Sequence, residues 1–349
     1  MQRQSFFGFW AIVFLAFLSA CGGGEGDKQN QYHGISGETM GTYYKITYFH
    51  PEVGPKELKV AVDSVLGVFN ASLSTYIENS TISQFNQSKD TFDFSEQNVA
   101  NTLFEKVLTY SDQVYEETDG AFDPTVMPLV NAWGFGFEKA EEVDSNMVDS
   151  LMQYVGFEQL TIENQSLIKS NEGIMLDFSA IAKGLGVDFV GAYLDHLGIQ
   201  NYLIEVGGEL VARGKNKDGL IWRVGIEVPK EEAAQAQELH SILQLEEAAM
   251  ATSGNYRNYY LRDGKRYAHT ISPKTGHPIE HQLLSSTVVH ENCMLADAYA
   301  TAFMVMGLEE SIAFAEANEI LVHFIHEGED GNLQSYTSPA LEKSIQTIQ

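Results

Sequence analysis

A carboxylate and a hydroxyl, four residues apart, lie in a segment whose other side chains are mostly small or apolar. The segment is CMLADAYATAFMVMG (residues 293–307), and the two residues are Asp297 and Thr301. Residues four apart share one face of an α-helix. Their oxygens suit a hard divalent cation such as Mg²⁺, which accepts few protein ligands when phosphates supply the rest. An Asp near a helix N-terminus is equally favoured by the helix dipole, so periodicity leaves both interpretations open.

A lysine lies where a strand is expected to run into a helix. In LDFSAIAKGLG (residues 176–186), Lys183 and the free N–H groups of a helix start could together hold a negatively charged group. The small residues and glycines also suit an ordinary close-packed turn. Such turns are common, so the segment taken by itself favours the structural interpretation.

Two further segments carry side chains that could act in proton transfer or nucleophilic attack. His269 precedes a turn in AHTISPKTGHPI (residues 268–279), but it is one of 10 histidines and its spacing gives it no priority. Ser253 in ATSGNYRNYY (residues 251–260) could be a nucleophile, yet the elbow Gly-x-Ser-x-Gly does not surround it. The sequence therefore argues against a serine hydrolase.

The composition is that of a globular protein with a strong acidic bias. The chain has 349 residues, 44% of them hydrophobic, and a formal net charge of −27. This excess of negative charge excludes nucleic acid as an expected partner. It also opposes any phosphate compound, whose binding would need local positive charge from a metal, a helix N-terminus or a well-placed lysine.

The first residues have the pattern of an export signal. Arg3 precedes an apolar run of 13 residues (6–18), too short to span a bilayer comfortably, and small residues lead to Cys21. Because this resembles the bacterial lipoprotein signal, we expect residues 1–20 to be removed, Cys21 to be lipidated and residues 21–33 to form a flexible tether. The protein would then be anchored on the periplasmic side of the cell envelope, at the inner membrane, and Cys293 would have no disulfide partner.

Residues 34–340 have the pattern of one α+β domain, with a mixed or antiparallel sheet flanked by helices. Apolar residues at helical spacing predict helices at residues 56–72, 97–118, 145–156, 182–197, 293–307 and 309–318. Residues 34–50 are expected to be extended, with a turn at Gly41. Shorter strands are expected at residues 160–162, 167–169, 174–178, 202–206, 209–213, 222–228, 240–245, 248–252, 267–271, 285–290 and 320–325.

Seven motifs, taken together, resemble a known family. In chain order they are MGTYYKI, DGAFDPTVMPLV, LDFSAIAKGLGVD, YLIEVGGEL, TSGNYRNYY, HTISPKTGHPI and ADAYATAFMVMG. They resemble the ApbE family of FAD:protein FMN transferases, and the similarity runs from about residue 34 to the last strands. Each motif alone is weakly specific, but seven in order behind a lipoprotein signal are highly specific.

The resemblance implies a reaction and its partners. Members of the family bind FAD and Mg²⁺, cleave the pyrophosphate, transfer FMN to a Thr or Ser hydroxyl of a target protein and release AMP. The targets are exported or membrane flavoprotein subunits. Some members also hydrolyse FAD, so an FAD pyrophosphatase is one alternative, and a flavin-binding lipoprotein without enzymatic activity is another.

The resemblance also assigns residues. It implies that Met40 and Tyr76 contact the flavin and that His269 and Ile271 lie at the reacting end, where His269 would accept the proton of the target hydroxyl. It places Lys183 at the FAD phosphates, either binding them or stabilising developing charge, and Asp188 on the adenine side. The remaining FAD-site residues are Ala121, Phe122, Asp123 and Thr125. The implied metal ligands are the carbonyl of Ala180 and the side chains of Asp297 and Thr301. Ser272 stands where many members have Asp, which leaves any electrostatic role of that Asp open.

Overall fold

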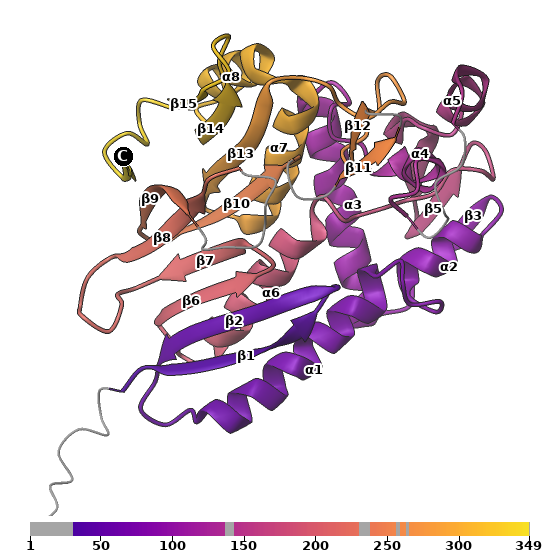
Figure 1. Cartoon of the computed structure of the whole chain (residues 1–349). Helices are drawn as coiled ribbons and strands as arrows, with labels where there is room; N and C mark the ends of the chain where they lie inside the picture. The colour runs from indigo at the N-terminus through magenta and orange to yellow at the C-terminus, as the bar shows by residue number, and fades with distance from the viewer. Residues whose placement is uncertain (1–30, 137–142, 230–237, 256–258, 263–264, 349) are drawn as a thin grey trace, which may run out of the picture.

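A central antiparallel sheet organises the protein (Figure 1). The computed structural model describes residues 31–136, 143–229, 238–255, 259–262 and 265–348, so the expected signal peptide and Cys21 lie outside the described residues. Within these ranges no helix is both long and apolar enough to cross a bilayer. In spatial order, the strands of the sheet are β1 (His33–Thr39), β2 (Thr42–Phe49), β6 (Asn201–Val206), β7 (Glu209–Arg213), β10 (Ala248–Gly254), β13 (Leu283–His290), β14 (Leu321–Glu327) and β15 (Leu333–Thr337).

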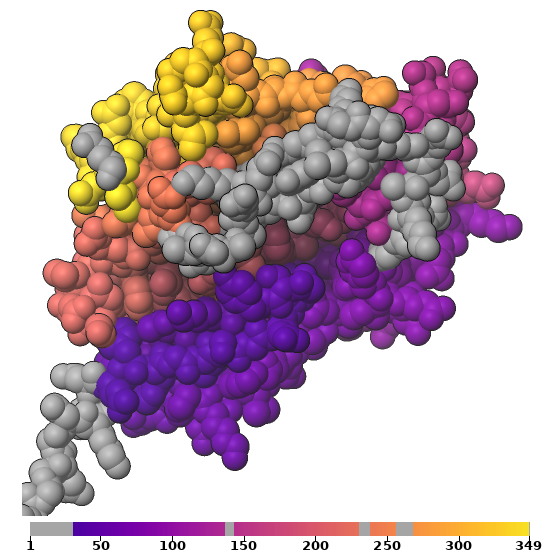
Figure 2. All heavy atoms as spheres, viewed as in Figure 1, coloured from indigo at the N-terminus to yellow at the C-terminus, as the bar shows by residue number. Residues whose placement is uncertain are grey.

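Helices cover one face of this sheet. α6 packs on β6 and β7, and α7 packs on β10 and β13, while α1 packs on β1 and α8 on β14. These helices, with α3 beside α1, are α1 (Pro55–Leu73), α3 (Val99–Glu117), α6 (Ala182–His196), α7 (Cys293–Met306) and α8 (Leu308–Ala317). The predicted α+β class, with helices flanking an antiparallel sheet, is therefore confirmed. Figure 2 shows the two edges of the sheet, the indigo N-terminal hairpin and the yellow C-terminal strands, on opposite sides of the molecule.

The opposite face of the central sheet packs against a smaller one. In β7 the side chain of Val211 joins the helix-side core, whereas its neighbours Leu210 and Ala212 join the other. This alternation follows from the pleat of a strand, which points successive side chains to opposite faces. The smaller sheet consists of β8 (Trp222–Glu227), β9 (Leu239–Leu245) and β16 (Ile345–Thr347).

Shorter elements complete the described chain. The short helices are α2 (Thr81–Gln87), α4 (Met127–Ala132), α5 (Ser145–Met152), and the 3₁₀ turns η2 (Pro124–Val126) and η3 (Phe157–Gln159). The short strands are β3 (Thr91–Asp93), β4 (Leu160–Glu163), β5 (Ser166–Lys169), β11 (Tyr259–Arg262) and β12 (Lys265–Ala268).

The predicted strand at residues 174–178 is wrong. The segment has no regular secondary structure and joins no sheet. A side chain bonds part of its backbone instead. The Leu176 N–H donates to Asn86 Oδ1 at 2.7 Å, and the Leu176 carbonyl accepts from Asn86 Nδ2 at 2.9 Å. The N–H of Asp177 donates to the carbonyl of Pro124 at 2.8 Å. A buried backbone must find such partners, and here the partner is the side chain of a distant residue. The predicted strand at residues 267–271 is also interrupted, since β12 ends at Ala268.

Helices α6 and α7 stabilise each other's first turns. Asp188 on α6 accepts hydrogen bonds from the N–H groups of Cys293 and Met294, at 3.0 and 2.9 Å, where α7 begins. Asp297 on α7 accepts from the N–H of Gly184, at 2.9 Å, near the start of α6. Each carboxylate thus satisfies amides that have no partner within their own helix and lies at the positive end of the other helix dipole.

The two helices touch at Gly184. A Cβ added there would lie 2.3 Å from the carbonyl oxygen of Cys293. We therefore expect Gly184→Ala to lower the free energy of unfolding by about 1–3 kcal/mol, since the backbone of α7 would have to move. Gly67 in α1 is a matched control, because a Cβ there meets nothing within 4 Å. Gly67→Ala should raise stability by about 0.5–1 kcal/mol. Urea unfolding of the two variants checks both; equal stability of Gly184→Ala and the original protein would contradict the close contact.

Candidate active site

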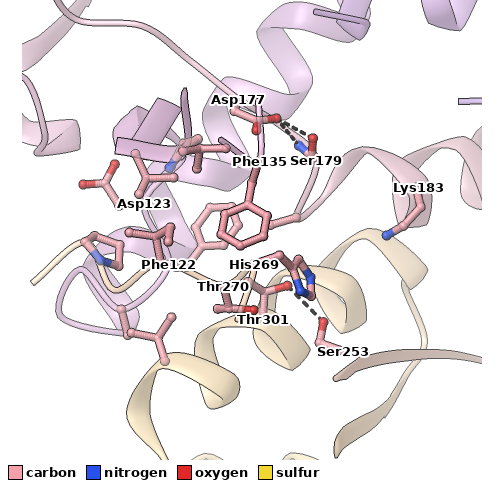
Figure 3. A pocket seen from close by; sticks show the side chains of 18 of the residues that line it. Phe122, Asp123, Phe135, Asp177, Ser179, Lys183, Ser253, His269, Thr270 and Thr301 are labelled. Atoms are coloured by element: carbon pink, nitrogen blue, oxygen red, sulfur yellow. Dashed lines mark hydrogen bonds between the residues drawn. The ribbon is translucent and has the colours of Figure 1, made fainter. Parts of the chain in front are cut away.

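One large pocket lies where the start of α6, the end of β10 and one face of α7 meet the loop before η2. Its volume is about 750 Å³, within the range of small-molecule sites. Figure 3 shows side chains from all these elements turned toward one space. Eight of the residues assigned from the sequence line it: Ala121, Phe122, Asp123, Ala180, Lys183, His269, Ile271 and Thr301. The fold therefore brings together motifs that are far apart in the sequence.

One end of the pocket holds buried charges. Lys183 Nζ lies 2.9 Å from Glu209 Oε1 and 3.4 Å from Asp297 Oδ1. The Lys183 side chain keeps 30% exposure toward the pocket, whereas both carboxylates are almost fully buried. Burial lowers the pKa of Lys183, but the charges of Asp297 and Glu209 act against this and raise it above its ordinary value. Lys183 is therefore a permanent cation that a phosphate could reach.

Hydroxyl oxygens gather beside these charges. Thr301 Oγ1 and Ser253 Oγ lie 3.0 Å apart, and both residues line the pocket together with Ala180 (Figure 3). Thr301 follows Asp297 by one turn of α7, as their spacing predicts. Ser253 lies near the end of β10, and its hydroxyl bonds the hydroxyl of Thr301, not a histidine. The arrangement gives no support to a serine nucleophile.

The donor atoms that the ApbE resemblance assigns have the chemistry of a hard divalent cation site. They are oxygens only, from Asp297, Thr301 and the backbone of Ala180, and such ligands suit Mg²⁺. Two acidic side chains, Asp297 and Glu209, lie near the one positive charge of Lys183. Burial raises the pKa of Glu209 to about 7, although the charge of Lys183 acts against the rise, so the cluster has negative charge in excess once Glu209 is ionised. Among the described residues no three His, Cys, Asp or Glu side chains form a metal-binding group. The set implied here contains one carboxylate and does not need such a group.

The other end of the pocket is aromatic and apolar. Phe122 and Phe135 face the pocket beside His269, whose ring centroid lies 6.4 Å from that of Phe135 (Figure 3). Val126, Val130 and Val305 add aliphatic lining. This end suits a flat, mostly apolar ring system, with His269 placed between it and the charged end.

Asp123 and Thr125 fix the loop at the apolar end. Asp123 Oδ1 accepts from the N–H of Thr125 at 2.8 Å and from its hydroxyl at 2.6 Å, which begins η2. Thr125 Oγ1 accepts in turn from the N–H of Gly156 at 2.7 Å. Burial raises the pKa of Asp123 to about 6, although the bonds from Thr125 act against the rise; the charge of Glu158 adds to it. Thr125 itself is buried behind the wall and does not line the pocket.

Comparison with known proteins agrees with the motifs. A family model described as the ApbE family matches residues 40–324. The chain belongs to the ApbE family. An FAD:protein FMN transferase of Vibrio cholerae is 39% identical over 336 residues, covering 95% of this chain and 97% of that protein. One from Escherichia coli K12 is 36% identical over 322 residues, covering 89% and 88%.

Solved structures of the ApbE family have the same fold. The flavin transferase ApbE from Vibrio cholerae superposes with a TM-score of 0.80 at 40% identity, covering 90% of this chain and 99% of that one. The flavinyl transferase ApbE of Pseudomonas stutzeri, in its apo form, gives 0.79 at 34% identity, covering 90% and 97%. The predicted family and fold are confirmed.

Several residues assigned through the ApbE resemblance lie outside the pocket wall. Met40 occupies the two-residue turn between β1 and β2 at a φ of 50°, and its methyl group packs toward Gly186 of α6. Tyr76 is 78% exposed on the loop after α1. Asp297 lies buried behind Lys183, and Asp188 bonds the backbone of α7 rather than lining a substrate site.

Sequence reasoning missed several residues of this ApbE pocket. From the sequence, Glu209 was assigned only to a strand. A carboxylate in a buried strand is as unusual as Asp297 in its buried helix. Phe135 follows the motif that contains Phe122 and carries no separate signal. Asp177 and Ser179 also line the pocket, and Asp177 Oδ1 accepts from the N–H of Ser179 at 2.8 Å.

The raised pKa of Asp123 predicts a pH-dependent stability. Between about pH 4 and about pH 6 the folded state binds this proton and the unfolded state does not, so stability falls as pH rises. Asp123→Asn keeps an oxygen for both Thr125 bonds but does not titrate. Between pH 4 and pH 7, the free energy of unfolding of the variant should rise relative to that of the original protein by up to about 3 kcal/mol. Urea unfolding across this range measures the difference, and parallel profiles would contradict the buried, proton-holding carboxyl.

Proposed function

We propose that this protein transfers FMN from FAD to a Thr or Ser hydroxyl of a target flavoprotein and releases AMP. The observation that carries the proposal is one pocket that joins an aromatic end to a buried charged end, with a histidine between them. FAD has the matching parts, an apolar ring system and a pyrophosphate. The relatives and solved structures named as flavin transferases support the same reaction.

The residues divide between binding and chemistry. Phe122 and Phe135 would contact the flavin ring, and the ammonium of Lys183 would bind the pyrophosphate as a fixed positive charge. Asp297, Thr301 and the carbonyl of Ala180 would hold Mg²⁺. When bound there, Mg²⁺ would offset phosphate charge and polarise the bond to be broken.

The reaction exchanges one phosphoester bond for another. The target hydroxyl oxygen forms a bond to the phosphorus of the FMN half, and the bond from that phosphorus to the bridging oxygen breaks. AMP leaves with the bridging oxygen, and the hydroxyl proton passes to a ring nitrogen of His269. General base catalysis of this kind contributes roughly 10²–10⁴-fold. The positive charge of Lys183 would stabilise the negative charge that develops on the phosphate in the transition state. Positioning and charge stabilisation supply most of the rate in phosphoryl transfer.

We propose further that the domain works from a lipid anchor on the periplasmic face of the inner membrane. The basis is the export pattern that ends at Cys21, followed by a Gly-rich polar stretch (residues 22–31). Such a tether raises the effective concentration of the pocket near proteins on the same membrane face. The targets would then be exported or membrane flavoprotein subunits with an accessible Thr or Ser.

The direct test incubates the detergent-purified full chain with FAD and Mg²⁺, with and without an exported flavoprotein acceptor. We expect in-gel flavin fluorescence on the acceptor and one AMP per transferred FMN, measured by chromatography. Equally fast AMP release without acceptor, and no labelled protein, would identify a pyrophosphatase. FAD that stays bound without any AMP would identify a flavin-binding protein and overturn the transferase.

His269→Ala separates binding from transfer. We expect FAD binding, followed by quenching of flavin fluorescence, to stay within a few-fold of the original protein, while acceptor labelling falls by about 10²–10⁴-fold. His326→Ala on β14 is the control, because His326 does not line the pocket. Full labelling activity in His269→Ala would remove the histidine from the mechanism.

A further inference from the structure

A buried glutamate at the charged end of the pocket has no part in the function proposed so far. Glu209 is the first residue of β7, directly after the Gly207–Gly208 turn, and is 3% exposed. Its Oε1 lies 2.9 Å from Lys183 Nζ. Its other oxygen, Oε2, is buried and accepts no hydrogen bond from any described residue. A buried carboxylate with one unpaired oxygen lowers the stability of the folded protein. A role of Glu209 in the site would account for its presence despite this cost.

Lys183 lies between two carboxylates that are not equivalent. Asp297 already uses Oδ2 to accept from the N–H of Gly184, and its Oδ1 faces the ammonium at 3.4 Å. Glu209 is closer to the ammonium, and its Oε2 accepts no hydrogen bond from the part of the chain that the structure describes. The lysine stem also lies beside the turn that precedes β7, since a Cβ added to Gly207 would lie 3.5 Å from Lys183 Cδ. The ammonium therefore lies closer to the Glu209 carboxylate on β7 than to the Asp297 carboxylate on α7, which it also contacts.

This asymmetry matters because Lys183 and a divalent cation need the same oxygen. Asp297 Oδ1 is the carboxylate oxygen free of backbone bonds, and it is the one that faces Lys183. If Lys183 paired with Asp297 alone, binding a metal there would first require that buried ion pair to be broken. Separating such a pair is unfavourable because the Asp297 carboxylate is almost fully buried.

We propose that Glu209 is a positioning residue that draws the Lys183 ammonium toward β7 and so weakens the ion pair with Asp297 that a divalent cation would have to displace. The proposal rests on the metal site of the proposed function. Glu209 acts through Lys183 and does not itself touch the metal or the substrate. Lys183 then keeps its charge beside the pocket, where the pyrophosphate can meet both the ammonium and the metal.

A double-mutant cycle on metal affinity tests this proposal without turnover. Mn²⁺ binding to the full chain in detergent is titrated by electron paramagnetic resonance at about pH 8, above the value of about 7 to which burial raises the pKa of Glu209. Glu209→Gln should weaken Mn²⁺ binding on the order of tenfold, a typical coupling between contacting charges. In a Lys183→Met background the same substitution should have almost no effect, because the competing ammonium is gone.

The alternatives give different results. If Glu209 attracts the metal by its charge alone, Glu209→Gln will weaken binding equally in both backgrounds, which would overturn the positioning role. Glu246→Gln is the control for net charge, since Glu246 is 61% exposed and forms an ion pair with Lys215. Thermal unfolding of each variant confirms that it folds. Absence of Mn²⁺ binding in the original protein would instead overturn the metal site of the proposed function, so the two failures are distinguishable.

Discussion

The reciprocal bonding of two aspartates to the starts of neighbouring helices is the interaction on which the site depends. Asp188 holds the first amides of α7, and Asp297 holds the amide of Gly184 near the start of α6. Both carboxylates lie close to positive helix ends, which offsets part of the cost of burying them. Because Gly184 has no side chain, the helices approach closely enough for these bonds to form. Lys183 and Thr301 are carried on the same two helices and are fixed by the same contact.

This arrangement solves an electrostatic problem. A protein with a net charge of −27 must bind a dinucleotide with a negatively charged pyrophosphate. Among the described residues that line the pocket, Lys183 is the only lysine or arginine. Its charge acts at short range and in a partly desolvated place, where interactions are screened far less than at the surface. The acidic residues that surround it keep the lysine charged. In the proposed function one of them would also provide an oxygen for a metal, so the negative charge of the cluster would assist binding.

The sequence predicts the fold well where the signal is local. Helical periodicity locates α1, α3, α6 and α7 within a few residues, and the Gly41 turn marks the β1–β2 hairpin. It fails at residues 174–178, where the deciding partner, Asn86, is 90 residues away and invisible to any local pattern. The site follows the same rule: the motifs of His269 and Lys183 reach the pocket, whereas Asp188 has a packing role that only the contact between α6 and α7 reveals. Glu209 had a usable signal, a carboxylate in a buried strand.

The central claim is that Asp297 and Thr301 present their oxygens to a metal at the charged end of the pocket. A crystal of the protein grown with FAD and Mn²⁺, measured at the manganese absorption edge, tests this most directly. The account predicts one anomalous peak within about 2.5 Å of Asp297, Thr301 and the Ala180 carbonyl, next to the pyrophosphate. A peak elsewhere in the pocket would contradict the claim. So would bound FAD with Lys183 still paired with Asp297 and no manganese beside them.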